Sequence, residues 1–158
     1  MKKLKNPFTT SEEFSCIGCS PSNPIGFQLE FYLDEENGIL TTEWNPQPLF
    51  QGYKNVVHGG IQATLMDEIA SWVVYSIIGT GGVTSQMHVR YRKPTFITDG
   101  PLKVKAQVEK HEKKLADIKT QLYNNKNELC AEATVQYFVF PENIAKEKYG
   151  YPGKDAFF

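Results

Sequence analysis

The residues best suited to chemistry lie in one stretch, Asn55–Val74, which reads NVVHGGIQATLMDEIASWVV. His58, Gly59 and Gly60 stand where a helix is predicted to begin. Two glycines allow another molecule to approach the backbone closely, because no Cβ intervenes. The first amides of a helix lack partners within it, and the helix dipole makes that end electropositive. Such a helix start could bind a carbonyl oxygen or an oxyanion, although the same residues could also form an ordinary turn.

Two adjacent carboxylates, Asp67 and Glu68, follow within the same apolar stretch. Asp67 comes two helical turns after Gly60, about 10 Å along the axis. A buried carboxylate is costly unless it is paired or hydrogen-bonded, and neighbours on a helix point about 100° apart. We therefore expect one carboxylate to face a cavity and the other to be solvated or ion-paired. An ion pair between Asp67 and a basic residue across the sheet is the alternative. In a symmetric dimer, Asp67 of one subunit could serve the helix start of the other.

Three further groups could contribute to a site. His58 could act as a general base, but the chain has no G-x-S-x-G signature of a serine nucleophile, so we favour a role in shaping the turn before the helix. Thr84 opens a predicted strand, where its hydroxyl could hold water or substrate or simply suit a pleated surface. The basic residues Arg90, Arg92 and Lys93 could form a solvated strand end or receive a phosphorylated ligand.

The three cysteines do not form an evident framework. Their odd number argues against paired disulfides. Cys16 and Cys19 form a C-x-x-C that invites a zinc site, but a structural zinc site takes four ligands. The other candidates, Cys130 and the three histidines, are isolated in the sequence. We therefore predict no metal site and interpret the pair as a reduced, partly buried turn.

The elements that must position these residues follow from periodicity. Residues 60–78 carry apolar side chains on nearly every side of a helix, which predicts a long helix surrounded by protein. Strict alternation after this helix places Thr84 on the face opposite Met87, Val89 and Tyr91. The chain is thus expected to be α+β, with one long central helix wrapped by a curved antiparallel β-sheet in hairpin or meander order. The predicted strands cover residues 27–33, 39–44, 83–92, 102–109, 116–123 and 129–139.

Composition sets the remaining limits. A chain of 158 residues suits one domain, which we divide into a leader (1–22), a domain (23–142) and a tail (143–158) that is flexible or docks on a neighbouring subunit. A net charge of −1 gives no bulk field that favours nucleic acid or an anionic membrane. The basic start is not followed by an apolar signal segment, and the longest apolar stretch is too short to span a bilayer. A cytoplasmic location is expected.

Two motifs taken together, VVHGGIQATLMDE and VTSQMHVRYRKP, resemble the hotdog-fold acyl-CoA thioesterases of the phenylacetate-pathway (PaaI-like) type. The resemblance covers roughly residues 52–140 and implies the hotdog fold. It implies that the backbone N–H of Gly59 polarises the thioester carbonyl, with His58 and Gly60 completing the motif. It also implies that Asp67 is the catalytic carboxylate, as general base or nucleophile, and that Thr84 helps to position the attacking water.

The same resemblance implies a thioester hydrolase that acts on acyl-CoA. It implies a homodimer or homotetramer with each active site at a dimer interface, and no cofactor other than the coenzyme A of the substrate. Phosphates of coenzyme A would meet Arg90, Arg92 and Lys93. Many members carry an Asn or Gln before the HGG, and here FQGYKN offers Gln51 or Asn55. The alternative is a non-hydrolytic module that binds acyl-CoA or an acyl-carrier-protein thioester. A hotdog dehydratase is less favoured, because such enzymes pair His with an acid in a different motif.

Overall fold

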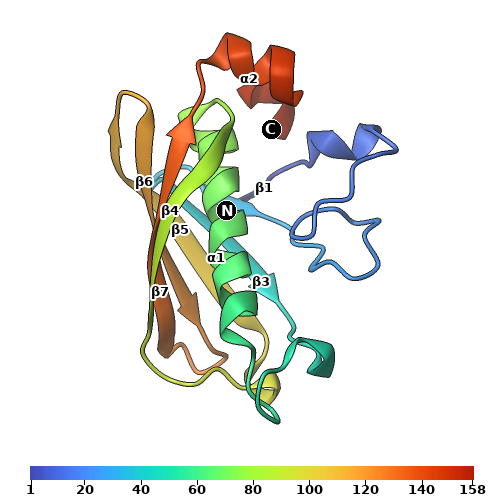
Figure 1. Ribbon diagram of the computed structural model, residues 1–158, viewed down its shortest axis with the longest axis vertical. Helices are drawn as coiled ribbons and strands as arrows, with labels where there is room; N and C mark the ends of the chain where they lie inside the picture. The colour runs from blue at the N-terminus through green and yellow to red at the C-terminus, as the bar shows by residue number, and fades with distance from the viewer.

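The computed structural model describes residues 1–158 and shows one long helix, α1 (Gly59–Val73), wrapped by a curved seven-stranded sheet (Figure 1). Every pairing in the sheet is antiparallel. This arrangement confirms the predicted α+β hotdog fold. The strands are β1 (Lys2–Lys3), β2 (Tyr32–Asp34), β3 (Ile39–Trp44), β4 (Gly82–Tyr91), β5 (Leu102–Glu112), β6 (Leu115–Tyr123) and β7 (Leu129–Val139). Besides α1, the helices are α2 (Glu142–Tyr149) and 3-10 turns at Pro7–Thr10, Pro48–Phe50, Ile97–Asp99 and Lys154–Phe157.

The order of strands in the sheet is β1-β2-β3-β5-β6-β7-β4. The pairs β2–β3, β5–β6 and β6–β7 are hairpins, as the alternating patterns predicted. β4 is the exception, because the chain after α1 crosses to the far edge of the sheet and pairs with β7. The predicted hairpin or meander order was therefore wrong for β4, which does not pair with the next strand, β5. As a consequence, one side of this long strand is an open edge of the sheet.

The central helix begins and ends where the sequence predicted. His58 is its N-cap, and the backbone N–H of Gly60 donates to His58 Nδ1 at 2.9 Å. After Val73 the chain continues as a π-helical turn to Ile78 and ends at Gly79, whose φ of 88° is left-handed and suits glycine. The side chains of α1 that face the core are completely or almost completely buried, and they include Leu65, Met66, Ile69 and Trp72. Burial of each such side chain stabilises the folded state by about 1.5–3 kcal/mol. None of the helices combines the length and apolar character needed to cross a membrane.

The first predicted strand is shorter than expected. Residues 27–33 show the expected alternation, with every second side chain buried. However, only Tyr32–Asp34 pair with a neighbouring strand. The reason is that Gln28 has a left-handed φ of 53°, and the backbone N–H groups of Phe27 and Leu29 donate to the carbonyls of Ile17 and Gly18 at 2.8 and 2.9 Å. This segment therefore holds the leader rather than another strand.

Both ends of the chain join the central core. Leu4 and Phe157 are buried in the same hydrophobic cluster as α1, and the backbone N–H of Lys5 donates to the Phe157 carbonyl at 2.9 Å. The Tyr151 hydroxyl donates to the Tyr75 carbonyl at the end of the helix, at 2.9 Å. Tyr151 and Phe157 of the tail therefore pack against the chain's own helix, whereas docking of the tail on a neighbouring subunit stays a prediction.

Candidate active site

The carboxylate of Asp67 on α1 is held by two hydroxyl groups from the sheet. Thr84 Oγ1 donates to Asp67 Oδ1 at 2.7 Å, and the Tyr137 hydroxyl lies 3.0 Å from the same oxygen. No ion pair involves Asp67, so the alternative of a basic partner across the sheet is not realised. The second oxygen, Oδ2, receives no hydrogen bond from the protein. One oxygen is thus fixed, and the other is left to accept a proton.

Tyr137 is a site residue that sequence reasoning missed. It lies on β7 directly opposite Thr84 on β4 and is buried. Its hydroxyl also lies 3.1 Å from the backbone carbonyl of Asp67. Burial, together with the charge of Asp67, raises the pKa of Tyr137 above its ordinary value. The hydroxyl therefore remains a proton donor. In the sequence it is simply one inward residue of a strand, and cross-strand register could not be deduced.

A bulge in β4 turns Thr84 toward the helix. The register shifts between Thr84 and Gln86, so Ser85 has no direct partner on β7. Thr84 lies opposite Tyr137, which points inward from β7. Met87, Val89 and Tyr91 also lie opposite inward-pointing residues of β7. The predicted alternation, which placed Thr84 opposite Met87, Val89 and Tyr91, was therefore wrong. The extra residue puts them all on the inner face, as β-bulges commonly re-aim side chains.

The helix start offers one uncommitted amide. The N–H of Gly60 is taken by His58 Nδ1, and those of Ile61 and Gln62 donate to the His58 carbonyl at 3.0 and 3.1 Å. The N–H of Gly59 donates no hydrogen bond within the chain. Tyr91 covers this residue, since its hydroxyl donates to the Gly59 carbonyl at 2.6 Å. Of the predicted HGG motif, only Gly59 thus has an N–H free for a ligand.

Gly59 and Asp67 do not meet within one protomer. They lie on the same helix, eight residues apart, which corresponds to about 12 Å along the axis. A reacting carbonyl must lie about 3 Å from the donor that binds its oxygen and within reach of the base. The N–H of Gly59 and the carboxylate of Asp67 in one copy of this chain are therefore too far apart to act on the same carbonyl group.

The remaining predicted residues lie apart from Asp67. Gln51 and Asn55 belong to the loop before α1, where Gln51 Oε1 accepts from the Asn55 backbone N–H at 3.0 Å. Arg92 forms a two-pronged ion pair with Glu132, at 3.0 and 3.1 Å. Lys93 pairs with Glu128, whereas Arg90 forms no ion pair. The basic cluster is therefore largely neutralised by carboxylates of the chain itself.

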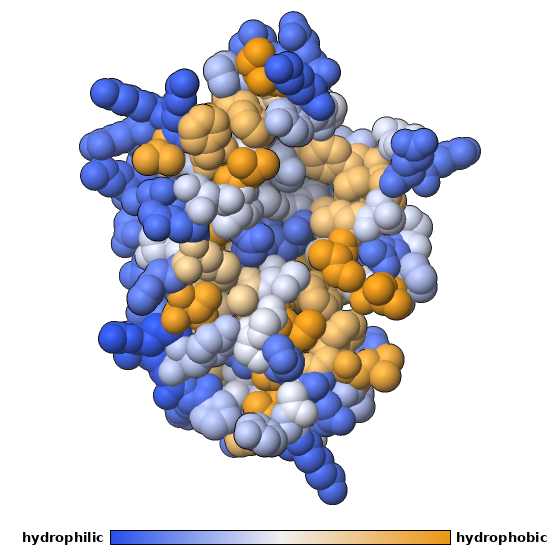
Figure 2. Space-filling model, in the orientation of Figure 1, coloured by the Kyte–Doolittle hydropathy of each residue, from blue (hydrophilic) through white to orange (hydrophobic).

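A cavity of about 450 Å³ lies beside the Asp67 site. It opens between the leader and β4 on the face shown in Figure 2, where hydrophobic side chains gather around a hollow. Thr84 and Tyr137, the two partners of Asp67, form part of its wall. Most of the remaining wall is aromatic or sulfur-containing, contributed by Phe8, Phe14, Cys16, Cys19, Tyr75 and Tyr149. The cavity thus offers a largely aromatic space next to the hydroxyl-held carboxylate, with Glu68 and Ser71 also in its wall.

Glu68 occupies a different environment on the side of the helix that faces the leader. Its Oε1 lies 3.4 Å from Cys16 Sγ. Burial, and then the charge of Cys16, raises the pKa of Glu68 to about 8. Hydrogen bonds from Cys19 lower the pKa of Cys16, while hydrogen bonding to Cys16 and burial raise the pKa of Cys19. Cys16 is half-buried and Cys19 is buried, which agrees with the partly buried turn that the sequence predicted, and the turn encloses a carboxylate that sequence reasoning did not connect to it.

A family model described as the thioesterase superfamily matches residues 54–131 of this chain. The matched segment runs from the loop before α1 into β7 and includes Gly59, Asp67 and Thr84. In sequence, the chain is similar to a candidate esterase of Saccharolobus solfataricus, with 26% identity over 121 residues that cover 76% of this chain and 77% of that protein.

Solved structures agree with this likeness. A protein of Bacillus halodurans with coenzyme A has a TM-score of 0.62 at 29% identity, covering 73% of this chain and 76% of that one. A thioesterase superfamily protein has a TM-score of 0.66 at 21% identity over 75% of this chain, which spans 57% of that protein's length. The Escherichia coli PaaI protein of the phenylacetic acid degradation operon has a TM-score of 0.59 at 17% identity, covering 66% and 75% of the two chains.

Proposed function

We propose that this chain, which belongs to the hotdog-fold thioesterase superfamily, hydrolyses an acyl-CoA thioester to the free acid and coenzyme A. Membership confirms the family and the enzyme class, a thioester hydrolase, that the motifs predicted. The observation that carries the proposal is the carboxylate of Asp67, with one oxygen fixed by Thr84 and Tyr137 and the other unbonded. Coenzyme A as the thiol is supported by the relative solved with it.

In the proposed reaction, Asp67 Oδ2 takes a proton from a water molecule as that water attacks the thioester carbonyl. The Thr84 hydroxyl donates a hydrogen bond to Asp67 Oδ1, so its lone pairs are left to accept a hydrogen bond from the same water. A general base of this kind contributes about 100-fold to 10,000-fold in rate. The thiolate is a good leaving group, so the reaction requires no strong general acid, metal or other cofactor at the sulfur.

The oxyanion that forms would be bound by the free N–H of Gly59. A single such donor stabilises the transition state by about 3 kcal/mol. Because one protomer keeps Gly59 too far from its own Asp67, the complete site requires a second copy of the chain. The site would therefore combine Asp67 of one protomer with the partner subunit's Gly59.

The open edge of β4 is the surface that we assign to this homodimer. β4 spans ten residues and lies at the end of the sheet, so one row of its backbone N–H and C=O groups lacks a partner strand. Apolar side chains on this strand are also exposed, with Val83 at 48% and Tyr91 at 49%. Long exposed edges of this kind are covered in stable proteins. A two-fold pairing of β4 with its copy would continue the sheet across the dimer.

We assign the acyl group to the cavity beside Thr84 and Tyr137. Its aromatic wall, which includes Phe8, Phe14 and Tyr75, favours an aryl or compact apolar acyl group through ring packing. Arg90, the one basic residue of its cluster without an ion pair, is the best remaining contact for a phosphate of coenzyme A.

The test is thiol release from a panel of acyl-CoAs that includes acetyl, hexanoyl, palmitoyl and phenylacetyl esters. We expect hydrolysis of at least one ester, with a preference for aryl or medium acyl groups. The variant Asp67→Asn, which lacks the proposed base, should lose this activity. Its matched control is Asp155→Asn, since Asp155 is exposed and forms no ion pair. Tight binding of acyl-CoA without thiol release from any ester would instead support a binding module and would contradict hydrolysis.

A further inference from the structure

The leader and the central helix bring three potential metal ligands together. The thiols of Cys16 and Cys19 and a carboxylate oxygen of Glu68 all lie within 4.8 Å of one another. Cys16 Sγ and Glu68 Oε1 are 3.4 Å apart. In a tetrahedral zinc site, bond lengths of about 2.3 Å to sulfur and 2.0–2.2 Å to oxygen separate sulfur from oxygen by about 3.5 Å. The spacing between Cys16 Sγ and Glu68 Oε1 therefore matches that of two ligands on one ion.

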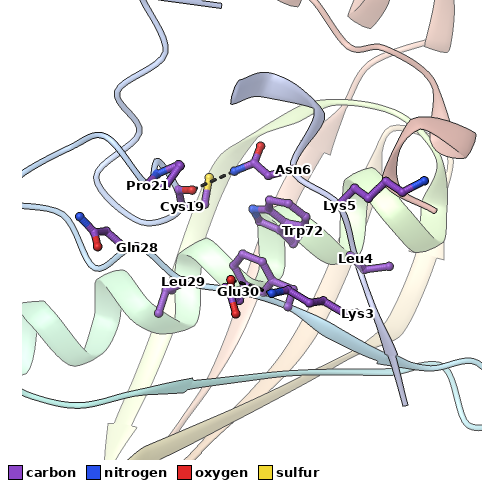
Figure 3. Close-up of a pocket in the computed structure, with 11 residues that line it drawn as sticks. Lys3, Leu4, Lys5, Asn6, Cys19, Pro21, Gln28, Leu29, Glu30 and Trp72 are labelled. Carbon is purple, nitrogen blue, oxygen red and sulfur yellow. Dashed lines mark hydrogen bonds and ion pairs between the residues drawn. The ribbon is translucent and has the colours of Figure 1, made fainter. Parts of the chain in front are cut away.

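The loop that carries the two thiols is held in place along its whole length. The backbone N–H of Cys19 donates to Cys16 Sγ at 3.3 Å, and that of Ser20 donates to the Cys16 carbonyl at 3.2 Å. The Asn6 side chain donates to the Cys19 carbonyl at 2.8 Å, as Figure 3 shows in the wall of a neighbouring cavity. With the two bonds from Phe27 and Leu29 described above, the sulfurs are presented by a preorganised turn.

Glu68 is fitted closely against this turn. A Cβ on Gly18 would come within 2.3 Å of Glu68 Cγ, so glycine at that position makes room for the carboxylate. None of the seven ion pairs of the chain includes Glu68. A carboxylate partly buried beside two thiols without a basic partner must either hold a proton or receive a cation from outside. A divalent ion would supply that charge.

We propose that Cys16, Cys19 and Glu68 bind one divalent metal ion, with Zn²⁺ the best match to two sulfur donors and one oxygen. All three ligands line the cavity that Thr84 and Tyr137 share, so the fourth ligand would come from the cavity side, as water or a bound molecule. The ion would tie the leader to α1 beside Asp67. This proposal revises the sequence-based expectation of no metal, and it does not depend on thioester hydrolysis.

The test uses the whole chain, reduced, stripped of metal with a chelator and titrated with Co²⁺ without oxygen. Thiolate coordination gives charge-transfer absorption in the near ultraviolet, and tetrahedral Co²⁺ gives intense visible bands. We expect both to saturate at one ion per chain and Zn²⁺ to displace them. A saturating excess of Zn²⁺ should raise Tm by about 5 °C or more.

Three variants separate this site from other ones. Cys16→Ser with Cys19→Ser should abolish the charge-transfer bands, and Glu68→Gln should weaken Co²⁺ binding at least about tenfold. Cys130→Ser is the matched control, since Cys130 is buried on β7 and not in this group. Reduced wild-type protein that takes up no Co²⁺, or bands that persist in Cys16→Ser with Cys19→Ser, would overturn the proposal. The proposal would also be overturned if the two cysteines formed a Cys16–Cys19 disulfide in air but bound no metal ion when reduced.

Discussion

Asp67 and Glu68 are neighbours on one helix, but they face different layers of the protein. Asp67 turns to the sheet, where two hydroxyl groups donate to one of its oxygens. Glu68 turns to the leader, where its neighbours are the sulfurs of Cys16 and Cys19. Hydroxyl donors stabilise a carboxylate while leaving it able to take a proton, whereas thiols beside a buried carboxylate need a proton or a cation. The layer that covers each face of the helix, rather than the acid itself, thus sets what each carboxylate can do.

The largest expected effect separates the two acids directly. Asp67→Asn should lower kcat/KM for the best acyl-CoA by about 100-fold or more, because it removes the proposed base. Glu68→Gln should lower it less than about tenfold, since that side chain meets the leader and not the attacking water. Steady-state thiol release on both variants checks the contrast. Equal losses would show that the two sides of the helix are not functionally distinct.

Removal of one backbone N–H should have a comparable effect. Gly59→Pro deletes the proposed oxyanion donor, and proline is well tolerated at the first position of a helix. We expect kcat/KM to fall about 100-fold with Tm little changed.

Mixing two inactive variants sharpens this prediction. Co-expression of Gly59→Pro with Asp67→Asn should restore about a quarter of the wild-type activity, because half of the random dimers then contain one intact shared site. Each pure variant is the control. Activity that stays at the level of the pure variants would contradict a site shared between two protomers.

A smaller effect is expected on the sheet side of Asp67. Tyr137→Phe removes one of two donors to the carboxylate, and the loss of about 1–1.5 kcal/mol corresponds to a roughly tenfold lower kcat. The control is Tyr123→Phe on β6, whose hydroxyl forms no hydrogen bond and whose ring lies near Lys105. If both variants keep wild-type kcat, then Tyr137 only fills the core.

The smallest effect on hydrolysis should come from the leader side. Gly18→Ala places a methyl group against Glu68, and overpacking of this kind destabilises a protein by about 1–3 kcal/mol. We expect a lower Tm and weaker Co²⁺ binding, with kcat/KM changed less than about threefold. Thermal unfolding and the cobalt titration measure the first two quantities. An unchanged Tm would mean that Glu68 is free to move away from the turn.

Patterns that are local in sequence predicted much of this molecule. Apolar spacing predicted the helix from residue 60 to 78, and alternation predicted the long strands after it. The HGG start and Asp67 stood out because glycine pairs and acids are unusual in an apolar helix. The C-x-x-C was also visible, but its partner Glu68 is 49 residues further along the chain than Cys19. Such a contact depends on how the leader folds back, which no local pattern contains.

Other features required knowledge of register. Tyr137 reaches Asp67 because β7 pairs with β4 in a particular alignment, and its spacing alone matches any inward strand residue. The position of β4 at the edge was missed because antiparallel strands that follow one another usually pair, and β4 does not. The packing of Tyr151 and Phe157 on the helix was missed because the tail's aromatic side chains have no period, and these two contact a surface built from distant segments.

The bulge at Ser85 makes the orientation of Thr84 depend on the path of the backbone through β4 rather than on the identity of its residues. A regular strand through the same residues, without the bulge, would point Thr84 to the outer face while Met87, Val89 and Tyr91 kept their places. The hydroxyl would then leave Asp67 although no side chain of the site had been substituted. Loss of Ser85 itself would, by contrast, remove the bulge and leave Thr84 on the same inner face as Met87.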